Sequence, residues 1–144
     1  MIEQDTIKLL RECDAGIKMG ISSINDVIDY ASAGALKESL RECKDEHIKL
    51  ETQTRGLLEE YGDDGKDPSL MAKGMSWMKT NVKLSLNESD HTIADLITDG
   101  CNMGVKSLNR YLNQYKAADE VSKDIAKRLI KLEDKLSVDM RDFL

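Results

Sequence analysis

The stretch from Ala35 to Tyr61 carries the feature that most limits how this chain can fold. Its apolar and weakly polar residues recur at alternating steps of three and four, which places them on one face of a long helix. The positions are Leu36, Leu40, Cys43, His47, Leu50, Thr54, Leu57 and Tyr61. Because a stripe of this length must be covered by other helices, the spacing predicts a helical bundle. A histidine stands in the middle of the stripe, so His47 is the first candidate functional residue.

The same spacing predicts three more long helices and one shorter one. The long helices are expected over residues 6–30, 89–115 and 120–143, and the shorter one over residues 69–86. Their stripes are Ile7, Leu10, Asp14, Ile17, Ile21, Ile24 and Ile28; then Ile93, Leu96, Ile97, Gly100, Gly104, Leu108, Tyr111 and Tyr115; then Val121, Ile125, Leu129, Leu132, Leu136, Met140 and Phe143. Only the last stripe has no polar or glycine break. Gly16 and Gly20 lie beside the first stripe, where we expect them to let a neighbouring helix pack closely.

These elements predict an all-α fold with a four-helix bundle in one domain, residues 1–144. Residues 6–61 form one antiparallel hairpin and residues 89–143 form another, joined by a helical crossover over residues 62–88. Three side chains are predicted N-caps, and one glycine is a predicted left-handed helix end. The N-caps are Asp5, Ser32 and Asp119, and the glycine is Gly62.

Composition narrows the class of partner and the cell compartment. The net charge of −6 disfavours nucleic acid and anionic membranes, and an aromatic content of 4% disfavours a base-stacking surface. No apolar run approaches the ~20 residues that cross a membrane, and no basic cluster with an apolar run opens the chain as a secretion signal would. The cysteines Cys13, Cys43 and Cys101 are odd in number and far apart, which is typical of reduced thiols. We therefore expect a cytoplasmic protein.

The chain also resembles the ferritin-like superfamily, and within it a bacterial family whose domain has no known function. The matching features are Asp14 before Gly16, the pattern from Leu36–Lys37 to Leu50, and Gly100 in the middle of the helix predicted over residues 89–115. Met71, Gly74 and Ser76–Trp77–Met78 of the crossover add to the match. The resemblance covers nearly the whole chain and implies a ferritin-like bundle with a crossover between its second and third long helices.

Ferritin-like di-iron proteins bind metal through one carboxylate on each of two helices and a Glu-x-x-His pair on each of the others. This chain departs from that pattern, because Lys44 stands three residues before His47, and Leu136 stands three residues after Glu133. We therefore expect no metal and no other cofactor. The alternative is a residual site for iron, manganese, zinc or another divalent metal, and its ligands would be Asp14, His47, Glu51 and Glu133.

Three functional hypotheses follow. The first is a non-catalytic bundle that acts through protein–protein contacts, above all self-association, with Asp14 paired to His47 or Lys44 in a polar core layer that fixes helix register. The second is a degenerate metal-binding protein of the oxidoreductase or stress-related kind, in which Glu133 lies near the level of Cys101. The third is a thiol sensor that uses Cys13, Cys43 or Cys101.

Overall fold

The computed structural model describes residues 2–65 and 89–144, and these residues form helices and short connections without any strand. The long helices are α1 (Ile2–Val27), α2 (Gly34–Glu60), α4 (Ser89–Gln114) and α5 (Glu120–Met140). Short 3₁₀ turns follow α1 over Ile28–Tyr30 and α5 over Arg141–Phe143. The four predicted long helices are confirmed within a few residues at each end. The predicted helix at 69–86 lies outside the described residues.

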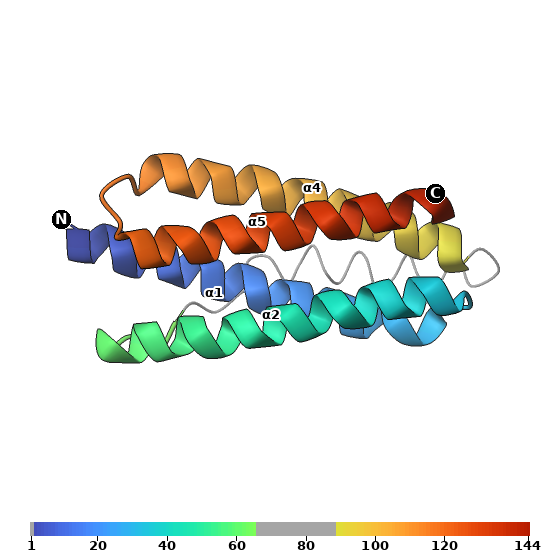
Figure 1. Ribbon diagram of the computed structural model, residues 1–144, viewed down its shortest axis with the longest axis horizontal. Helices are drawn as coiled ribbons and strands as arrows, with labels where there is room; N and C mark the ends of the chain where they lie inside the picture. The colour runs from blue at the N-terminus through green and yellow to red at the C-terminus, as the bar shows by residue number, and fades with distance from the viewer. Residues whose placement is uncertain (1, 66–88) are drawn as a thin grey trace.

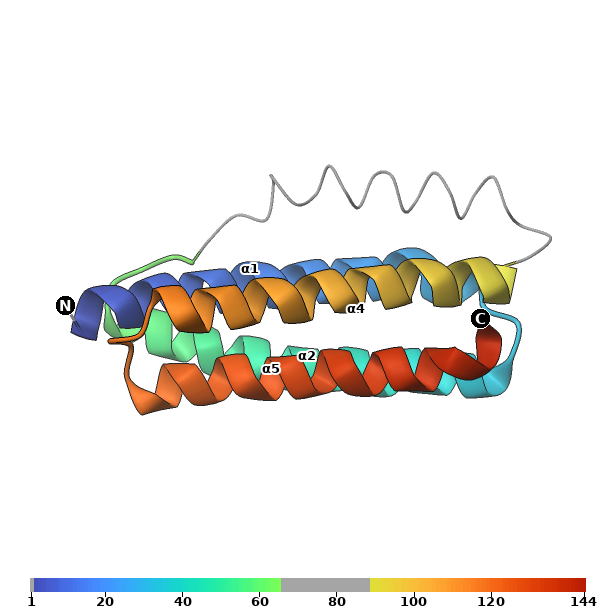
Figure 2. The same ribbon diagram turned by 90° about the horizontal axis from the view of Figure 1, so that it is seen from above.

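The four helices lie side by side along one axis, so the predicted four-helix bundle is confirmed (Figure 1). The chain turns back at residues 28–33 between α1 and α2, and again at residues 115–119 between α4 and α5. Seen from above, α1 and α4 form one layer and α2 and α5 form the other (Figure 2). Contacts within the pairs α1–α2 and α4–α5 are extensive, whereas α1 and α4 touch at fewer places. None of the described helices is long and apolar enough to cross a membrane.

Buried apolar side chains form two clusters along the bundle axis. One lies towards the turn between α1 and α2 and includes Ile24, Leu36, Leu40, Cys43, Ile93, Ile97, Cys101, Leu136 and Met140. The other includes Leu9, Leu10, Cys13, Ile17, Leu50, Leu58, Leu108, Ile125 and Leu129. Each fully buried aliphatic side chain stabilises the fold by roughly 1.5–3 kcal/mol. His47 lies on α2 between Cys43 of the first cluster and Leu50 of the second. The buried histidine is therefore located where the two apolar clusters meet.

The predicted stripe of α2 is confirmed from Leu36 to Thr54 and is wrong at its end. Leu58 is buried in place of Leu57, which is half-buried, and Tyr61 is exposed. The reason is geometric: steps of three and four average close to 3.5, while a straight helix has 3.6 residues per turn, so a long stripe drifts around the helix.

The predicted stripe of α5 needs two corrections. Val121 is 50% exposed, and Ser122 and Ala126 are buried at this end of the helix instead. The stripe was also expected to be free of polar residues, but Glu133 turns its side chain inward and leaves only 13% of it exposed.

Two of the predicted helix ends are confirmed. The Asp119 carboxylate accepts a hydrogen bond from the backbone N–H of Ser122 at 2.8 Å, which caps α5. Gly62 follows α2 with a φ of 69°, in the left-handed region that favours glycine.

The other two predicted caps, Asp5 and Ser32, are wrong. Asp5 lies inside α1 and accepts a hydrogen bond from the backbone N–H of Ala117 at 3.0 Å. Ser32 makes no side-chain cap for α2. Its backbone N–H and that of Ala33 donate to the Asp90 carboxylate at 2.7 and 3.0 Å. Both ends of the bundle are thus fixed by a carboxylate of one pair on a turn of the other.

Candidate functional site

A cavity of about 420 Å³ lies between α1 and α4, where these two helices make few contacts. It will be called the α1–α4 groove. Small residues face it from both helices, and this leaves space between the side chains that the structure describes. They are Gly16, Gly20 and Ser23 on α1, and Gly100, Gly104 and Ser107 on α4. The prediction that these glycines serve close helix packing is confirmed at Gly20, where an added Cβ atom would lie 2.7 Å from His47 Nε2 of α2. Gly16 and Gly20 also line the groove.

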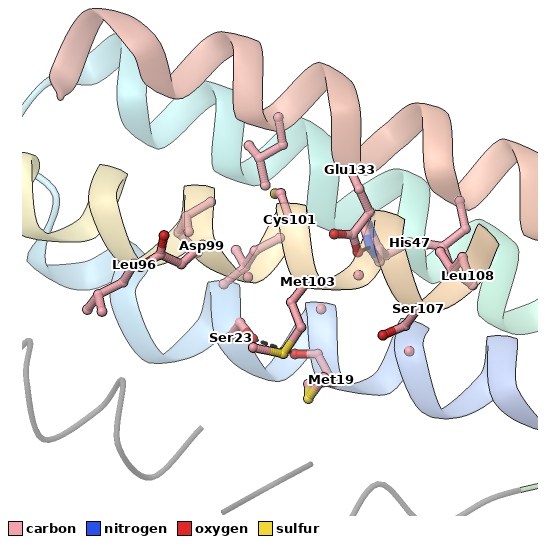
Figure 3. Close-up of a pocket in the computed structure, with 18 of the residues that line it drawn as sticks. Met19, Ser23, His47, Leu96, Asp99, Cys101, Met103, Ser107, Leu108 and Glu133 are labelled. Carbon is pink, nitrogen blue, oxygen red and sulfur yellow. Dashed lines mark hydrogen bonds and ion pairs between the residues drawn. The ribbon is translucent and has the colours of Figure 1, made fainter. Parts of the chain in front are cut away.

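The remaining walls of the groove are mainly apolar. They include Ile24, Leu96, Ile97, Leu108, Leu129 and Leu136, all buried. Met19 and Met103 line the side away from the core, and Met103 is 61% exposed (Figure 3). Methionine adapts its shape to an irregular contact, so these two side chains suit a site that receives an apolar group.

Two ionisable side chains form the floor of the groove. His47 from α2 and Glu133 from α5 point toward one another, as Figure 3 shows. His47 Nε2 lies 3.8 Å from Glu133 Oε1, and His47 is 2% exposed. The other ring nitrogen, Nδ1, lies 2.8 Å from the carbonyl oxygen of Cys43. A carbonyl only accepts, so Nδ1 carries a hydrogen. Nε2 is buried and makes no hydrogen bond to any residue that the structure describes.

This environment raises the pKa of His47. Burial alone lowers the pKa of an imidazole, but the contacts of His47 with Cys43 and with the nearby Glu133 carboxylate outweigh burial and bring the pKa to about 10. At neutral pH His47 is therefore an imidazolium, and it forms a buried ion pair with Glu133. Removing one partner of such a pair leaves an uncompensated buried charge, whereas replacing both by apolar residues is often neutral.

Two glycines leave the groove side of this pair free of side chains. A Cβ atom added to Gly20 would lie 2.7 Å from His47 Nε2, and one added to Gly104 would lie 2.7 Å from Glu133 Oε2. Both separations are too short for a real contact, so an alanine at either position would force the pair to move. At positions 20 and 104, backbone of α1 and α4 thus lies directly against the pair, and the Cys101 side chain of α4 also lies beside Glu133.

The three cysteines are buried, and two of them have pKa values raised well above the ordinary range. Burial, with the neighbouring Glu12 and Asp14, raises the pKa of Cys13 to about 12. Burial, with Glu133 beside it, raises the pKa of Cys101 as well. The predicted closeness of Glu133 and Cys101 is thereby confirmed. These thiols are held in the unreactive protonated form, which disfavours the thiol-sensor hypothesis for both of them.

The structure brings together two of the four predicted metal-site residues, His47 and Glu133. Asp14 is buried on α1 and pairs with Lys18 at 2.7 Å. Glu51 is partly exposed and lies 3.8 Å from Arg55. The prediction that Asp14 pairs with His47 or Lys44 is wrong, because Asp14 pairs with Lys18 and His47 pairs with Glu133. Among the described residues, no group of three or more His, Cys, Asp or Glu side chains is placed to hold a metal ion.

Sequence reasoning missed the groove, although the signal is present in the chain. Glycine recurs at a spacing of four in two helices, at positions 16 and 20 and at positions 100 and 104. Residues four apart share a helical face, so each pair marks a face without side chains. The sequence does not show that these two faces lie opposite each other in the bundle.

No family model matches this chain, and no curated protein or solved structure shows a significant match to it. The resemblance to the ferritin-like superfamily therefore stays a prediction. The functional inference has to rest on the groove and on the ion pair at its floor.

Proposed function

We propose that this protein is a non-catalytic helical bundle that binds a small, mainly apolar molecule in the α1–α4 groove. The observation that carries the proposal is the groove itself, a cavity of about 420 Å³ with apolar walls. Small-molecule sites typically occupy ~300–1,000 Å³ and combine apolar walls with a few convergent polar groups. His47 and Glu133 are such groups, and the raised pKa of His47 is typical of a functional site.

The ion pair favours binding over catalysis. A general base works best when its pKa lies near the working pH, because it must then accept and release a proton with similar ease. His47 holds its proton up to a pKa of about 10, so at neutral pH it is a poor base. A fixed donor and a fixed acceptor at the end of an apolar groove are instead suited to orienting a ligand.

We further propose that the bundle is of the ferritin-like kind, with two antiparallel hairpins joined by a crossover at residues 62–88. The order and length of α1, α2, α4 and α5 support this arrangement. Self-association, expected from the sequence, stays a prediction that light scattering of the purified chain tests. A mass of one chain at micromolar concentration would contradict it.

The alternative function, binding of iron or another divalent metal, retains one supporting observation. His47 and Glu133 come from different helices and face each other, as two ligands of a metal would. A stable site requires at least one further protein ligand, since even catalytic zinc keeps three. Metal analysis of protein from metal-rich medium tests this directly. Well under one ion per chain would count against the alternative, and one ion per chain would support it.

Binding of a neutral fluorescent dye, N-phenyl-1-naphthylamine, tests the ligand-binding proposal. We expect the dye to bind with a blue-shifted emission and to bind at least about tenfold more weakly to the variant Ser107→Leu. Ser107 lines the groove, so a leucine there fills part of the space. Lys106→Leu is the matched control, because Lys106 is exposed on the same helix and is outside the groove lining. Equal binding by both variants, or none by the unmodified chain, would refute the proposal.

A further inference from the structure

We infer that the ligand of the α1–α4 groove carries a hydroxyl group, and that this hydroxyl bridges His47 and Glu133. The inference rests on the proposed function and adds the chemical class of the ligand: an apolar alcohol rather than a hydrocarbon, an acid or an amine. Three observations carry it, namely the length of the gap in the ion pair, the hydrogen-bonding capacity on each side, and the charges of the groove lining.

The gap between the two side chains fits one oxygen atom. His47 Nε2 and Glu133 Oε1 are 3.8 Å apart, beyond the ~3.2 Å that limits a good N–H···O bond. An oxygen placed at ordinary hydrogen-bond lengths of about 2.8 Å from both atoms closes the gap as a bent bridge. Without such a bridge, Nε2 is a buried polar atom with no hydrogen bond to the described residues. A buried donor without a partner destabilises the folded chain, so a group that accepts a hydrogen bond from Nε2 is favoured there.

The two sides of the gap need different partners. The carbonyl of Cys43 fixes the hydrogen on Nδ1, and the Glu133 carboxylate keeps Nε2 protonated, so Nε2 donates. The carboxylate accepts. A hydroxyl both accepts and donates, so it satisfies both sides at once. A carboxylate ligand only accepts and would face Glu133, whereas an ammonium ligand only donates and would face the Nε2 hydrogen.

The charges around the groove sharpen this choice. Apart from the pair, the charged side chains among the described lining residues are Glu12 and Asp99, both acids. They oppose an anionic ligand, so a fatty or aromatic acid is disfavoured at the walls as well as at the floor. The same acids attract a cation to the groove, which makes an amine the most informative competitor of the alcohol.

The approach to the pair depends on the two glycines. Gly20 lies against His47 and Gly104 lies against Glu133, and neither position has room for a Cβ atom. His47 Nε2 is buried, and the backbone at Gly20 lies against it, so a hydroxyl inserts between the pair only if these groups shift slightly apart. The apolar body of the ligand lies along the Leu and Ile walls. The groove thus combines an apolar wall with one donor and one acceptor at a single point.

Four probes that share one ring system test the inference: 2-naphthalenemethanol, 2-methylnaphthalene, 2-naphthoic acid and 2-naphthylmethylamine. We measure their affinities by calorimetry and by displacement of the neutral dye. We expect the alcohol to bind about tenfold or more tighter than the hydrocarbon, which corresponds to one or two hydrogen bonds of ordinary net strength. The acid and the amine should both bind more weakly than the alcohol.

The double variant His47→Leu/Glu133→Leu provides the matched control. It replaces the ion pair by apolar side chains and is expected to fold. It should still bind the hydrocarbon, but the preference for the alcohol should disappear. If this variant does not fold, Glu133→Gln serves in its place: it keeps the shape but removes the charge, and the preference should fall at least about threefold.

The outcomes separate the two proposals. A preference for the alcohol that is lost in the variants supports the inference. Equal affinities for alcohol and hydrocarbon, a preference for the amine or the acid, or an alcohol preference that survives in the variants overturns the inference and leaves ligand binding intact. If none of the probes binds and the dye does not bind either, the proposed function itself is wrong, and the inference falls with it.

Discussion

Gly20 provides the sharpest test of the reasoning about the floor of the groove. Within a helix, alanine is favoured over glycine by roughly 0.5–1 kcal/mol, so a Gly→Ala change with free space around it should stabilise the fold. At position 20 the added Cβ would lie 2.7 Å from His47 Nε2 and 2.8 Å from Cδ2. We therefore predict that Gly20→Ala destabilises the protein, against the helix propensity of alanine.

The magnitude follows from what the new methyl group meets. The obstacle is a buried aromatic ring, and the ring is held by its hydrogen bond to the carbonyl of Cys43 at 2.8 Å. The ring cannot turn aside without losing that bond or its contact with Glu133. Overpacking of this kind costs roughly 1–3 kcal/mol, which exceeds the propensity gain. The expected net loss in the free energy of unfolding is about 1 kcal/mol.

Two matched variants isolate the collision from the propensity. At Gly16, one turn earlier on the same helix, the added Cβ would lie 3.7 Å from Leu129 Cδ2, an ordinary contact. At Gly56 on α2 nothing lies within 4 Å. Gly16→Ala and Gly56→Ala should therefore each raise the free energy of unfolding by roughly 0.5–1 kcal/mol. The difference between these variants and Gly20→Ala measures the overpacking cost directly.

Urea unfolding followed by circular dichroism at the helix band gives the three free energies under identical conditions. A second cycle adds His47→Ala: with the ring removed, Gly20→Ala should become stabilising, so the two changes couple by about 1–3 kcal/mol. The reasoning is refuted if Gly20→Ala stabilises the protein as much as Gly16→Ala does, or if the His47→Ala background leaves its effect unchanged.

Three further predictions concern other groups. The pKa of His47 is raised to about 10, so its pairing with Glu133 stabilises the fold fully below about pH 6.5 and progressively less as the pH rises towards 10. Among the described residues, Cys43 from α2 and Glu133 from α5 are the titratable groups that act on His47, and Cys101 from α4 lies beside Glu133. The free energy of unfolding of the unmodified chain should accordingly fall over that range relative to the His47→Leu/Glu133→Leu variant, and parallel curves would contradict the pairing. Asp119→Ala should lower the free energy of unfolding by roughly 0.5–2 kcal/mol through loss of the cap on α5, as urea titration measures, while a loss near zero would mean that the Ser122 N–H finds another acceptor. The three thiols are all buried, so a thiol reagent should modify them slowly in the native protein and quickly in urea, and fast modification of the native protein would restore the sensor hypothesis.

The sequence predicts the helices well because their signal is local and repeated. The stripe from Leu36 to Thr54 repeats the same spacing over several turns, so single deviations do not obscure it. The cap at Asp119 and the left-handed Gly62 are equally local. Predictions failed where a residue's partner comes from elsewhere in the chain. Asp5 looks like a cap in sequence, yet its carboxylate binds the backbone of Ala117, far along the chain.

The candidate site was half predicted for the same reason. His47 stands out within its own helix, because a histidine interrupts an aliphatic stripe. The identity of its partner depends on the rotation of each helix about its axis, which the stripe fixes only to within about a residue. A shift of that size is enough to bring Glu133 inward beside His47. Asp14 pairs instead with Lys18, one turn further along its own helix. The groove could not be predicted from the sequence, because it forms only where the glycine-bearing faces of α1 and α4 lie opposite each other.

Two features of the groove lower the stability of the fold, and they occur in the same small region. Their coincidence supports a function for the groove. Each glycine inside α1 or α4 costs roughly 0.5–1 kcal/mol relative to alanine. A buried ion pair is often no more stabilising than two apolar residues of the same size. The pair His47–Glu133 and the glycines at 20 and 104 meet at one point, and each glycine lies against one member of the pair. A bundle selected for stability alone would gain from leucine at the pair and alanine at the glycines, changed together. The histidine, the glutamate and the two glycines instead keep a polar floor that lies against backbone, as the proposed binding site requires.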